Sequence, residues 1–196
     1  ADKVILEVNP NFRRVRGGLE IPLKRVTSFF ISEKPIFTIP RSVPSEMDHK
    51  IGRYVADLIH DGDCIQLGFG GIPNAIGFEL MNRHDLGIHT EQIGASMAHM
   101  IQSGVVTNRY KNLDRGWSVG AFIIADNFTY NYVNNHPRIM MRRGRYTNDP
   151  MIIAQQDNMV SINAALQIDL TGQVAAEAIG TVQWSGTGGA TDYAYG

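Results

Sequence analysis

The ten residues from Cys64 to Pro73 constrain the fold more than any other segment of the chain. Cys64 to Leu67 is a short, mostly apolar run, which indicates a compact strand. It leads into the glycine-rich turn Gly68 to Gly71, and Pro73 follows where the first turn of a helix tolerates a missing N–H. A strand, a glycine turn and a helix in this order predict a βαβ unit with parallel strands.

The rest of the chain repeats this alternation of short β-branched runs and amphipathic segments. We therefore predict an α/β fold, in which a mostly parallel sheet is flanked by helices. Further strands are predicted at Val4 to Val8, Pro35 to Ile39, Leu86 to His89, Val119 to Ile124, Ile139 to Met141 and Met159 to Ile162. Further helices are predicted after Ser45, at Ala95 to Ile101 and at Asn127 to Val133. The stretch Val174 to Ile179 is too short for its period to distinguish a helix from a strand.

Ser45 and Asp48 mark the beginning of the first predicted helix. A serine followed three residues later by an acidic residue is the sequence pattern of an N-terminal capping box. Asp61-Gly62-Asp63 is predicted to end this helix. Its apolar face is predicted to consist of Ile51, Val55, Leu58 and Ile59.

Length and charge exclude several classes of protein. With 196 residues and a 43% hydrophobic composition, the chain can bury one ordinary core. Its formal net charge of -1 gives no strong overall field, which argues against a nucleic-acid binder or a membrane-surface binder. The sequence shows neither the roughly 20 consecutive apolar residues of a membrane helix nor the pattern of a secretory signal.

Cysteine and histidine usage predicts neither a disulfide nor a metal site. The single cysteine, Cys64, has no partner for an internal disulfide, which fits a reducing cytoplasmic location. The six histidines do not pair at metal-ligand spacing, so we expect no metal. His89 is expected to pack beside Glu91 and not to act as a base.

Glu91 is the residue that suggests the chemistry. It follows the apolar run Leu86 to Thr90, with Gly68 to Gly71 upstream and Ser185 to Gly189 downstream. Taken alone, an acidic residue at a strand end is usually solvated, and glycine-rich loops are usually tight turns or linkers. A carboxylate between two such loops can instead act as a nucleophile in acyl transfer, because fixed backbone N–H groups stabilise the oxyanion that forms.

Seven short segments carry a family resemblance across nearly the whole chain. They are Val8-Asn9-Pro10-Asn11, Gln66 to Pro73, Gly87 to Glu91, Gly104 to Asn108, Asn148-Asp149-Pro150, Gln156 to Asn163 and Ser185 to Gly189. In this order they resemble the acetyl-CoA hydrolase/transferase family of class I CoA-transferases, and most closely its 4-hydroxybutyrate and butyrate branch. The resemblance implies a CoA-transferase-like domain of the NagB/RpiA type. It also implies that residues 1–196 form one catalytic C-terminal domain, a fragment that lacks a similar N-terminal domain.

The resemblance implies an enzyme that moves CoA from an acyl-CoA such as acetyl-CoA to a small carboxylic acid. Glu91 would attack the thioester to give an acyl-glutamyl anhydride, and the released CoA thiolate would then form a glutamyl-CoA thioester. Butyrate, 4-hydroxybutyrate, succinate and itaconate all stay open as the acceptor. Two other functions also stay open: acyl-CoA hydrolysis on the same scaffold, and a non-catalytic CoA-binding module.

The same resemblance assigns roles to residues of both glycine loops. Binding of the oxyanion or of CoA is assigned to Gly68, Phe69, Gly70, Gly71, Gly188 and Gly189. Positions near the substrate are assigned to Asn148 and Ser185. CoA and acyl-CoA are expected as substrates, with no permanently bound cofactor. A homodimer or a larger homo-oligomer is the expected assembly.

Two segments depart from the family pattern, and one further stretch is rich in arginine. The segment Gln92 to Ser96 stands where relatives usually have Met-x-Ser-Asp-Gly, so an acidic residue near the site is absent. The segment Ala190 to Tyr193 stands where Gln-x-Asp-Phe is common. The basic stretch is either a solvated surface or a contact for the CoA phosphates, and it consists of Arg138, Arg142, Arg143 and Arg145.

Overall fold

The computed structural model describes residues 2–18, 20–40 and 43–196. Its helices are α1 Glu46–Ala56, α2 Gly71–Glu79, α3 Ala95–Gln102, α4 Asn127–Val133, α5 Gly144–Thr147, α6 Pro150–Ile153 and α7 Ala190–Tyr195, with the 3-10 helices η1 Leu23–Arg25 and η2 Leu80–Asn82. Its strands are β1 Ile5–Val8, β2 Ser28–Ile31, β3 Cys64–Leu67, β4 Gly87–Ile88, β5 Ser118–Gly120, β6 Ile139–Met141, β7 Met159–Ile162, β8 Gln167–Ile168, β9 Val174–Ala175, β10 Ala178–Ile179 and β11 Val182–Gln183. Within the described ranges, no helix has the length and apolar character needed to cross a membrane.

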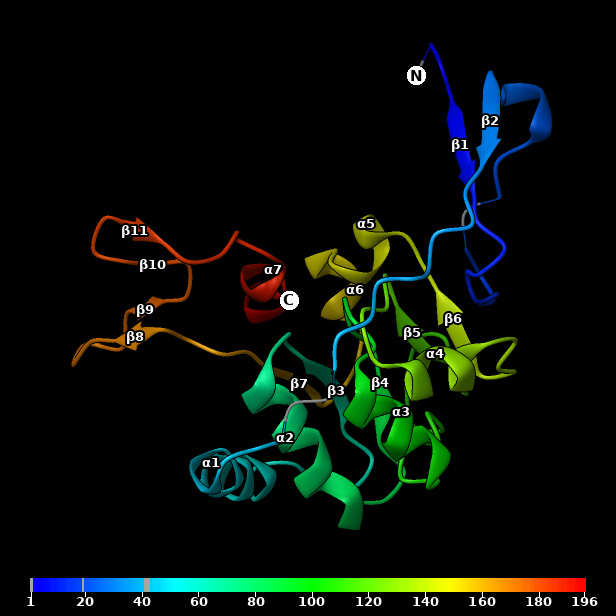
Figure 1. Ribbon diagram of the computed structural model, residues 1–196. Coiled ribbons are helices and arrows are strands. Elements are labelled where there is room, and N and C mark those ends of the chain that lie inside the picture. Colours follow the sequence, from blue (N-terminus) through cyan, green and yellow to red (C-terminus); the bar gives the residue numbers. More distant parts are fainter. Residues whose placement is uncertain (1, 19, 41–42) are drawn as a thin grey trace.

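A parallel sheet forms the centre of the molecule (Figure 1). β3 pairs in parallel with β4 on one side and with β7 on the other. Single parallel bridges from His89 to Val119 and from Gln92 to Phe122 connect the chain around β4 to the chain around β5, and β5 pairs in parallel with β6. The resulting order β7-β3-β4-β5-β6 confirms the predicted parallel α/β sheet.

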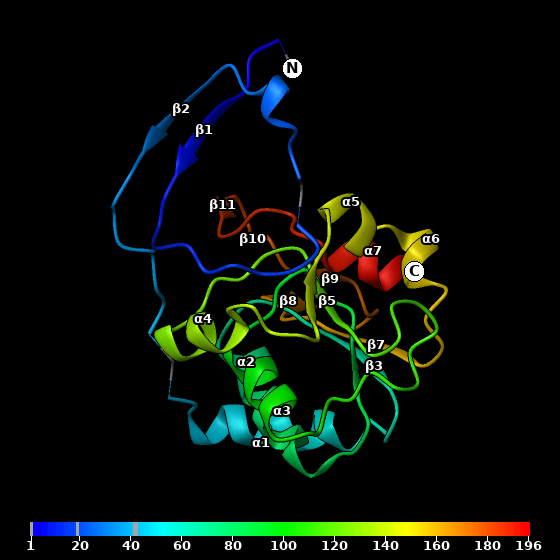
Figure 2. The ribbon, with the colours of Figure 1, turned by 90° about the vertical axis from the view of Figure 1, so that its right-hand side faces the viewer.

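The core surrounds β3, all four residues of which are buried. Such burial is typical of a parallel strand that is covered on both faces. Ile65 and Leu67 of this strand belong to one apolar cluster with Ile76 of α2 and Met97 of α3. Helices α1, α2 and α3 lie together on one side of the sheet, and α5, α6 and α7 gather on the other (Figures 1 and 2).

Two arms extend from this body. β1 and β2 pair in parallel in an arm that projects away from the sheet (Figure 2). The second arm consists of the antiparallel pairs β8-β9 and β10-β11 (Figure 1). Two-stranded sheets have marginal stability in water, so we expect the arms to add little to the stability of the core. Large exposed apolar side chains on the arms include Ile5, Phe29, Ile31, Ile168, Val174 and Val182.

Most predicted elements are confirmed. The boundaries predicted for α4, β6 and β7 agree with the structure, and Ser45 and Asp48 form the capping box of α1. The undecided stretch Val174 to Ile179 contains the short strands β9 and β10. The end of α1 was predicted too late: the helix ends at Ala56, and Leu58 is 72% exposed and does not join the buried face.

The strand predicted at Pro35 to Ile39 is wrong, and the early strand is β2 instead. Proline lacks the N–H that a strand donates to its neighbour, so Pro35 and Pro40 disfavour a ladder at both ends of this segment. Its Ile39 N–H donates to the carbonyl of Ala125 at 3.1 Å outside any strand pair. The strand predicted at Val119 to Ile124 is also shorter than expected, because β5 ends at Gly120.

Candidate active site

Glu91 stands just beyond the carboxyl end of β4, at the edge where open parallel sheets bind their ligands. Its backbone carbonyl accepts hydrogen bonds from Ala121 N at 2.8 Å and from Phe122 N at 3.0 Å. These two bonds join Glu91 to the chain that follows β5 and fix the backbone of Glu91. Its side chain is half-buried, so the carboxylate is partly withdrawn from water and still reachable.

The structure brings Asn148 and Gly189 to Glu91. A Cβ atom added to the buried Gly189 would lie 2.7 Å from Glu91 Oε2 and 3.3 Å from Glu91 Cδ, and it would collide with Asn148 Nδ2. Asn148 is the C-terminal cap of α5, and its Oδ1 accepts a hydrogen bond of 2.9 Å from Thr147 Oγ1. Because glycine has no Cβ, Gly189 lets a carboxylate and an amide approach its backbone from the same side.

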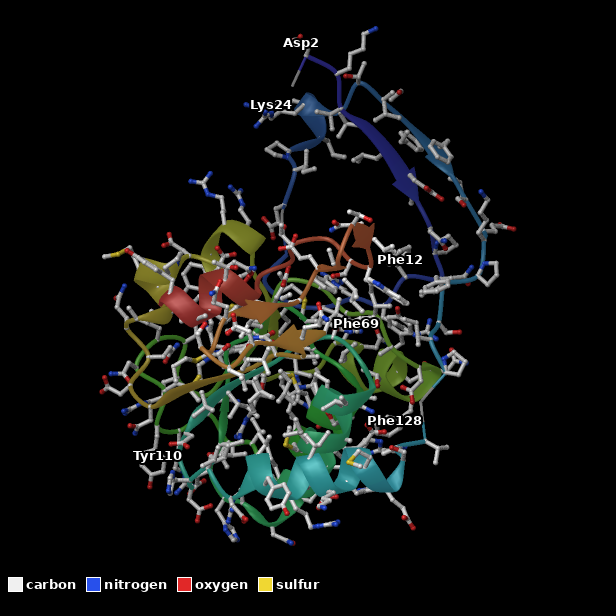
Figure 3. The ribbon with its side chains drawn as sticks, turned by 90° about the vertical axis from the view of Figure 1, so that its left-hand side faces the viewer. Asp2, Phe12, Lys24, Phe69, Tyr110 and Phe128 are labelled. Atoms are coloured by element: carbon white, nitrogen blue, oxygen red, sulfur yellow. The ribbon has the colours of Figure 1, made fainter. Side chains whose placement is uncertain are left out.

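The first glycine loop lines a pocket of about 280 Å³ beside Glu91. Gly70 is the N-cap of α2 with φ at 133°, a conformation that favours glycine, and it leaves the N–H groups of the first helical turn free for an anionic oxygen. Phe69 is 61% exposed above α2 (Figure 3). The opposite wall follows Glu91 directly in sequence, although Glu91 itself does not line the pocket, and consists of Gln92, Gly94, Ala95, Ser96 and Met97.

Of the other two predicted residues of the second loop, Ser185 lies apart from this cluster, and Gly188 directly precedes Gly189. Ser185 is exposed, and its hydroxyl donates to the carbonyl of Ala176 at 3.1 Å, within the arm of β8 to β11. Gly188 has φ at 54°, and a Cβ atom added there would meet nothing within 4 Å. The structure therefore places Gly189 against Glu91 and Ser185 in the arm.

His89 is fully buried two residues before Glu91. Its Nε2 lies 3.0 Å from the carbonyl of Thr147 and donates to it, which leaves Nδ1 as an acceptor. Burial, assisted by the charge of Lys111, lowers the pKa of His89 to about 4. The ring therefore packs behind the site as a neutral imidazole at pH 7.

We expect His89 to make the protein sensitive to moderate acid. Its pKa is about 4 in the folded chain and 6.5 by reference, so the unfolded chain binds more protons between these values. The free energy of unfolding should fall by about 3 kcal/mol as the pH drops from 6.5 to 4, since one pKa unit is worth about 1.4 kcal/mol. Chemical denaturation across this pH range measures the fall.

Two glutamine variants test this contribution. His89→Gln keeps a donor for the Thr147 carbonyl and removes the titrating ring. The free energy of unfolding of this variant should therefore fall less between pH 6.5 and 4. His60→Gln is the matched control, because the His60 side chain is 80% exposed. If the free energy of unfolding falls as steeply with pH in His89→Gln as in the control, His89 is not the source of the acid sensitivity.

Lys111 is a buried charged residue that joins the strands beneath Glu91, and the sequence did not predict this role. Lys111 is only 2% exposed, and its Nζ donates to the carbonyls of Ile88 at 2.9 Å and Trp117 at 2.8 Å. Burial lowers the pKa of Lys111 to about 8. One lysine in a loop has no periodic signal that could have predicted this role.

Within the described residues, no group of three or more histidine, cysteine or acidic side chains forms a candidate metal site.

Three arginines of the predicted basic stretch follow β6: Arg142, Arg143 and Arg145. Arg142 donates to Asp114 at 2.8 Å and lies 5.1 Å from the centroid of the Tyr146 ring. Burial acts to raise the pKa of Asp114, but hydrogen bonds from Tyr146 and Arg142 hold it below its usual value. Arg142, Arg143 and Arg145 are all exposed and line one pocket of about 560 Å³, separate from the pocket beside Glu91. The three arginines therefore share one exposed surface, and Arg142 in addition pairs with Asp114.

Comparison with known proteins shows which proteins the chain is similar to. The family model for the acetyl-CoA hydrolase/transferase C-terminal domain matches residues 126–196. The succinyl-CoA:cyclohexane-1-carboxylate CoA transferase of Geobacter metallireducens is 40% identical over 100% of this chain and 45% of its own length. Residues 126–196 thus match the C-terminal domain of the acetyl-CoA hydrolase/transferase family, and the similarity to a CoA-transferase extends over the whole chain.

A second curated relative and a solved structure agree with this match. The 4-hydroxybutyrate coenzyme A transferase of Clostridium kluyveri is 37% identical over 100% of the chain and 46% of its own length. The crystal structure of RipA from Yersinia pestis matches 98% of the chain and 44% of its own, with 42% identity and a TM-score of 0.92. These values confirm the predicted family and fold. The chain spans a little under half the length of the relatives it matches.

Proposed function

We propose that the complete protein is a CoA-transferase that moves CoA from an acyl-CoA to a small carboxylic acid, with Glu91 as the nucleophile. The observation that carries this proposal is the convergence of Glu91, Asn148 and Gly189 at the carboxyl end of the parallel sheet. A carboxylate held against backbone and amide donors suits an acyl transfer that passes through an oxyanion. The two enzymes compared above are also named as CoA-transferases.

The proposed reaction proceeds in balanced steps. An oxygen of Glu91 attacks the thioester carbon, the carbon–sulfur bond breaks, and an acyl-glutamyl anhydride and CoA thiolate result. The thiolate attacks the glutamyl carbonyl and releases the acyl group as a carboxylate, which leaves a glutamyl-CoA thioester. The incoming acid then reverses both steps. No general base is required, because the incoming carboxylic acid, with an ordinary pKa near ~4, is already ionised at neutral pH.

The backbone around the site supports specific roles in these steps. We assign Gly189 and the Asn148 amide to the oxyanion on the Glu91 side, because both lie against the carboxylate. We assign Gly68 to Gly71, at the beginning of α2, to the thioester and the adjoining part of CoA. Neither assignment uses Ser185, which the structure places in the arm.

We propose a small monocarboxylate, such as butyrate or 4-hydroxybutyrate, as the acid. The pocket beside Glu91 is modest in volume, at about 280 Å³, and takes apolar side chains from Ile39, Leu67, Met97 and Ile124. An apolar wall favours an alkyl chain over a second carboxylate, whose burial without a partner would be costly. We further propose that residues 1–196 supply the nucleophile domain of a longer, homo-oligomeric protein, in agreement with the greater length of the relatives.

Incubation of the complete protein with acetyl-CoA, with and without butyrate, tests the activity. We expect butyryl-CoA to form only when butyrate is added, and borohydride to trap a modified Glu91 that mass spectrometry locates. If CoA is released at the same rate without butyrate, the activity is acyl-CoA hydrolysis and not CoA transfer. Absence of both turnover and a trapped adduct would reject the enzymatic function and leave CoA binding alone.

A further inference from the structure

A pair of amide side chains joins β3 to β7 at the carboxyl ends of the two strands. Gln66 is only 4% exposed, although the other three residues of β3 are apolar. Its Nε2 donates to Asn163 Oδ1 at 3.0 Å. Its Oε1 accepts from Asn163 Nδ2 at 3.0 Å and from Ser161 Oγ at 2.8 Å. Gln66 and Asn163 therefore form a reciprocal pair, which satisfies an amide that would otherwise be costly to bury.

Asn163 also contacts the first residue of the glycine turn. A Cβ atom added to Gly68 would lie 2.9 Å from Asn163 Oδ1 and 3.3 Å from the carbonyl oxygen of Ile162. The N–H of Gly68 donates to that same carbonyl at 2.7 Å, so the bonding between β3 and β7 continues one residue into the turn. The φ of Gly68 is not positive, so the close approach of Asn163 is the reason that a glycine is needed here.

The turn that begins at Gly68 lines the pocket beside Glu91. All four of its residues, Gly68 to Gly71, belong to the pocket wall, and α2 begins at Gly71. Three of these four residues are glycines, and glycine restricts the backbone less than any other residue. Contacts from outside the turn are therefore required to hold its N–H groups in one direction. Asn163 supplies such a contact from the end of β7.

We propose that Gln66 and Asn163 are positioning residues, which hold the first glycine turn in the conformation that binds the thioester end of CoA. The inference rests on the proposed function, which assigns Gly68 to Gly71 to this part of the substrate. Gln66 is fixed by its burial in β3 and orients the Asn163 amide, and the amide limits the movement of Gly68. N–H groups that are already oriented lose less conformational entropy when CoA binds.

Asn163→Ala in the complete protein tests the proposal. We expect the Kd of CoA, measured by calorimetry, and the KM for acetyl-CoA to rise about tenfold, with a smaller change in kcat. Asn112→Ala is the matched control, because Asn112 is also exposed and its amide donates to Asp157 at 2.9 Å, just before the opposite end of β7. The control should keep the wild-type Kd and KM.

Gly68→Ala distinguishes positioning from a purely structural role. Its methyl group would collide with Asn163 Oδ1, so we expect this variant alone to raise the Kd of CoA about tenfold as well. In an Asn163→Ala background the collision is absent, so the further rise caused by Gly68→Ala should be much smaller. Additive effects of the two substitutions would overturn the proposal. A lower melting temperature of Asn163→Ala with the Kd of the control would also overturn it, because the pair would then stabilise the fold alone.

The calorimetric measurement requires no turnover, so it separates this proposal from the proposed CoA transfer. An unchanged Kd in Asn163→Ala, beside a wild type that forms butyryl-CoA, would reject the positioning role and leave the transferase function intact. A raised and non-additive Kd in a protein that forms no butyryl-CoA would support the positioning role and reject the transferase function. A wild-type protein that does not bind CoA would reject both.

Discussion

Glu91→Gln is expected to reduce CoA transfer by about 10⁴-fold or more, because an amide cannot form the anhydride or the thioester on which the proposed cycle depends. The substitution preserves the size of the side chain and its place against Gly189 and Asn148. The folded state and the binding of acyl-CoA should therefore change little. Steady-state formation of the product acyl-CoA by the complete protein measures the effect, and mass spectrometry shows whether the borohydride-trapped adduct disappears.

Two further variants sharpen this result. Glu46→Gln is the matched control, because Glu46 is an exposed residue at the beginning of α1, and it should keep the wild-type rate. Glu91→Asp keeps the charge but withdraws the carboxylate by one methylene, so we expect a rate between those of the wild type and Glu91→Gln. Equal rates for Glu91→Gln and Glu46→Gln would remove Glu91 from the chemistry.

Gly189→Ala is expected to lower CoA transfer by roughly 100-fold, because its methyl group would occupy the space of the Glu91 carboxylate and the Asn148 amide. The backbone of Gly189 has φ at -97°, which alanine adopts without strain. The loss should therefore come from displacement of Glu91 and Asn148 and not from misfolding of the loop. Measurement of kcat and KM, together with the melting temperature, distinguishes the two causes.

Gly186→Ala provides the control for this prediction within the same loop. A Cβ atom added to Gly186 would meet nothing within 4 Å, so this variant should keep its activity. Similar losses in both variants would mean that flexibility of the loop matters and that contact with Glu91 does not. Wild-type activity in Gly189→Ala would show that the contact with Glu91 and Asn148 is not the reactive arrangement.

Local sequence patterns predicted the elements that hold the site. The run Cys64 to Leu67, the glycine turn and Pro73 determined β3 and α2, because a buried strand, a positive φ and a helix start each require particular residue types. The same reasoning failed at Pro35 to Ile39, where β-branched composition indicated a strand. The missing N–H groups of the flanking prolines prevailed over that composition.

By itself, the sequence determined the parallel α/β class, the family and the place of Glu91 at the end of a strand. Periodicity and motif order are properties of neighbouring residues, so they can be read along the chain. Only the tertiary structure decided that Gly189 and Asn148, and not Ser185, lie against Glu91, and that Tyr193, His89 and Lys111 are buried behind it. These contacts join segments up to about a hundred residues apart, and their distances depend on how the sheet and its helices pack.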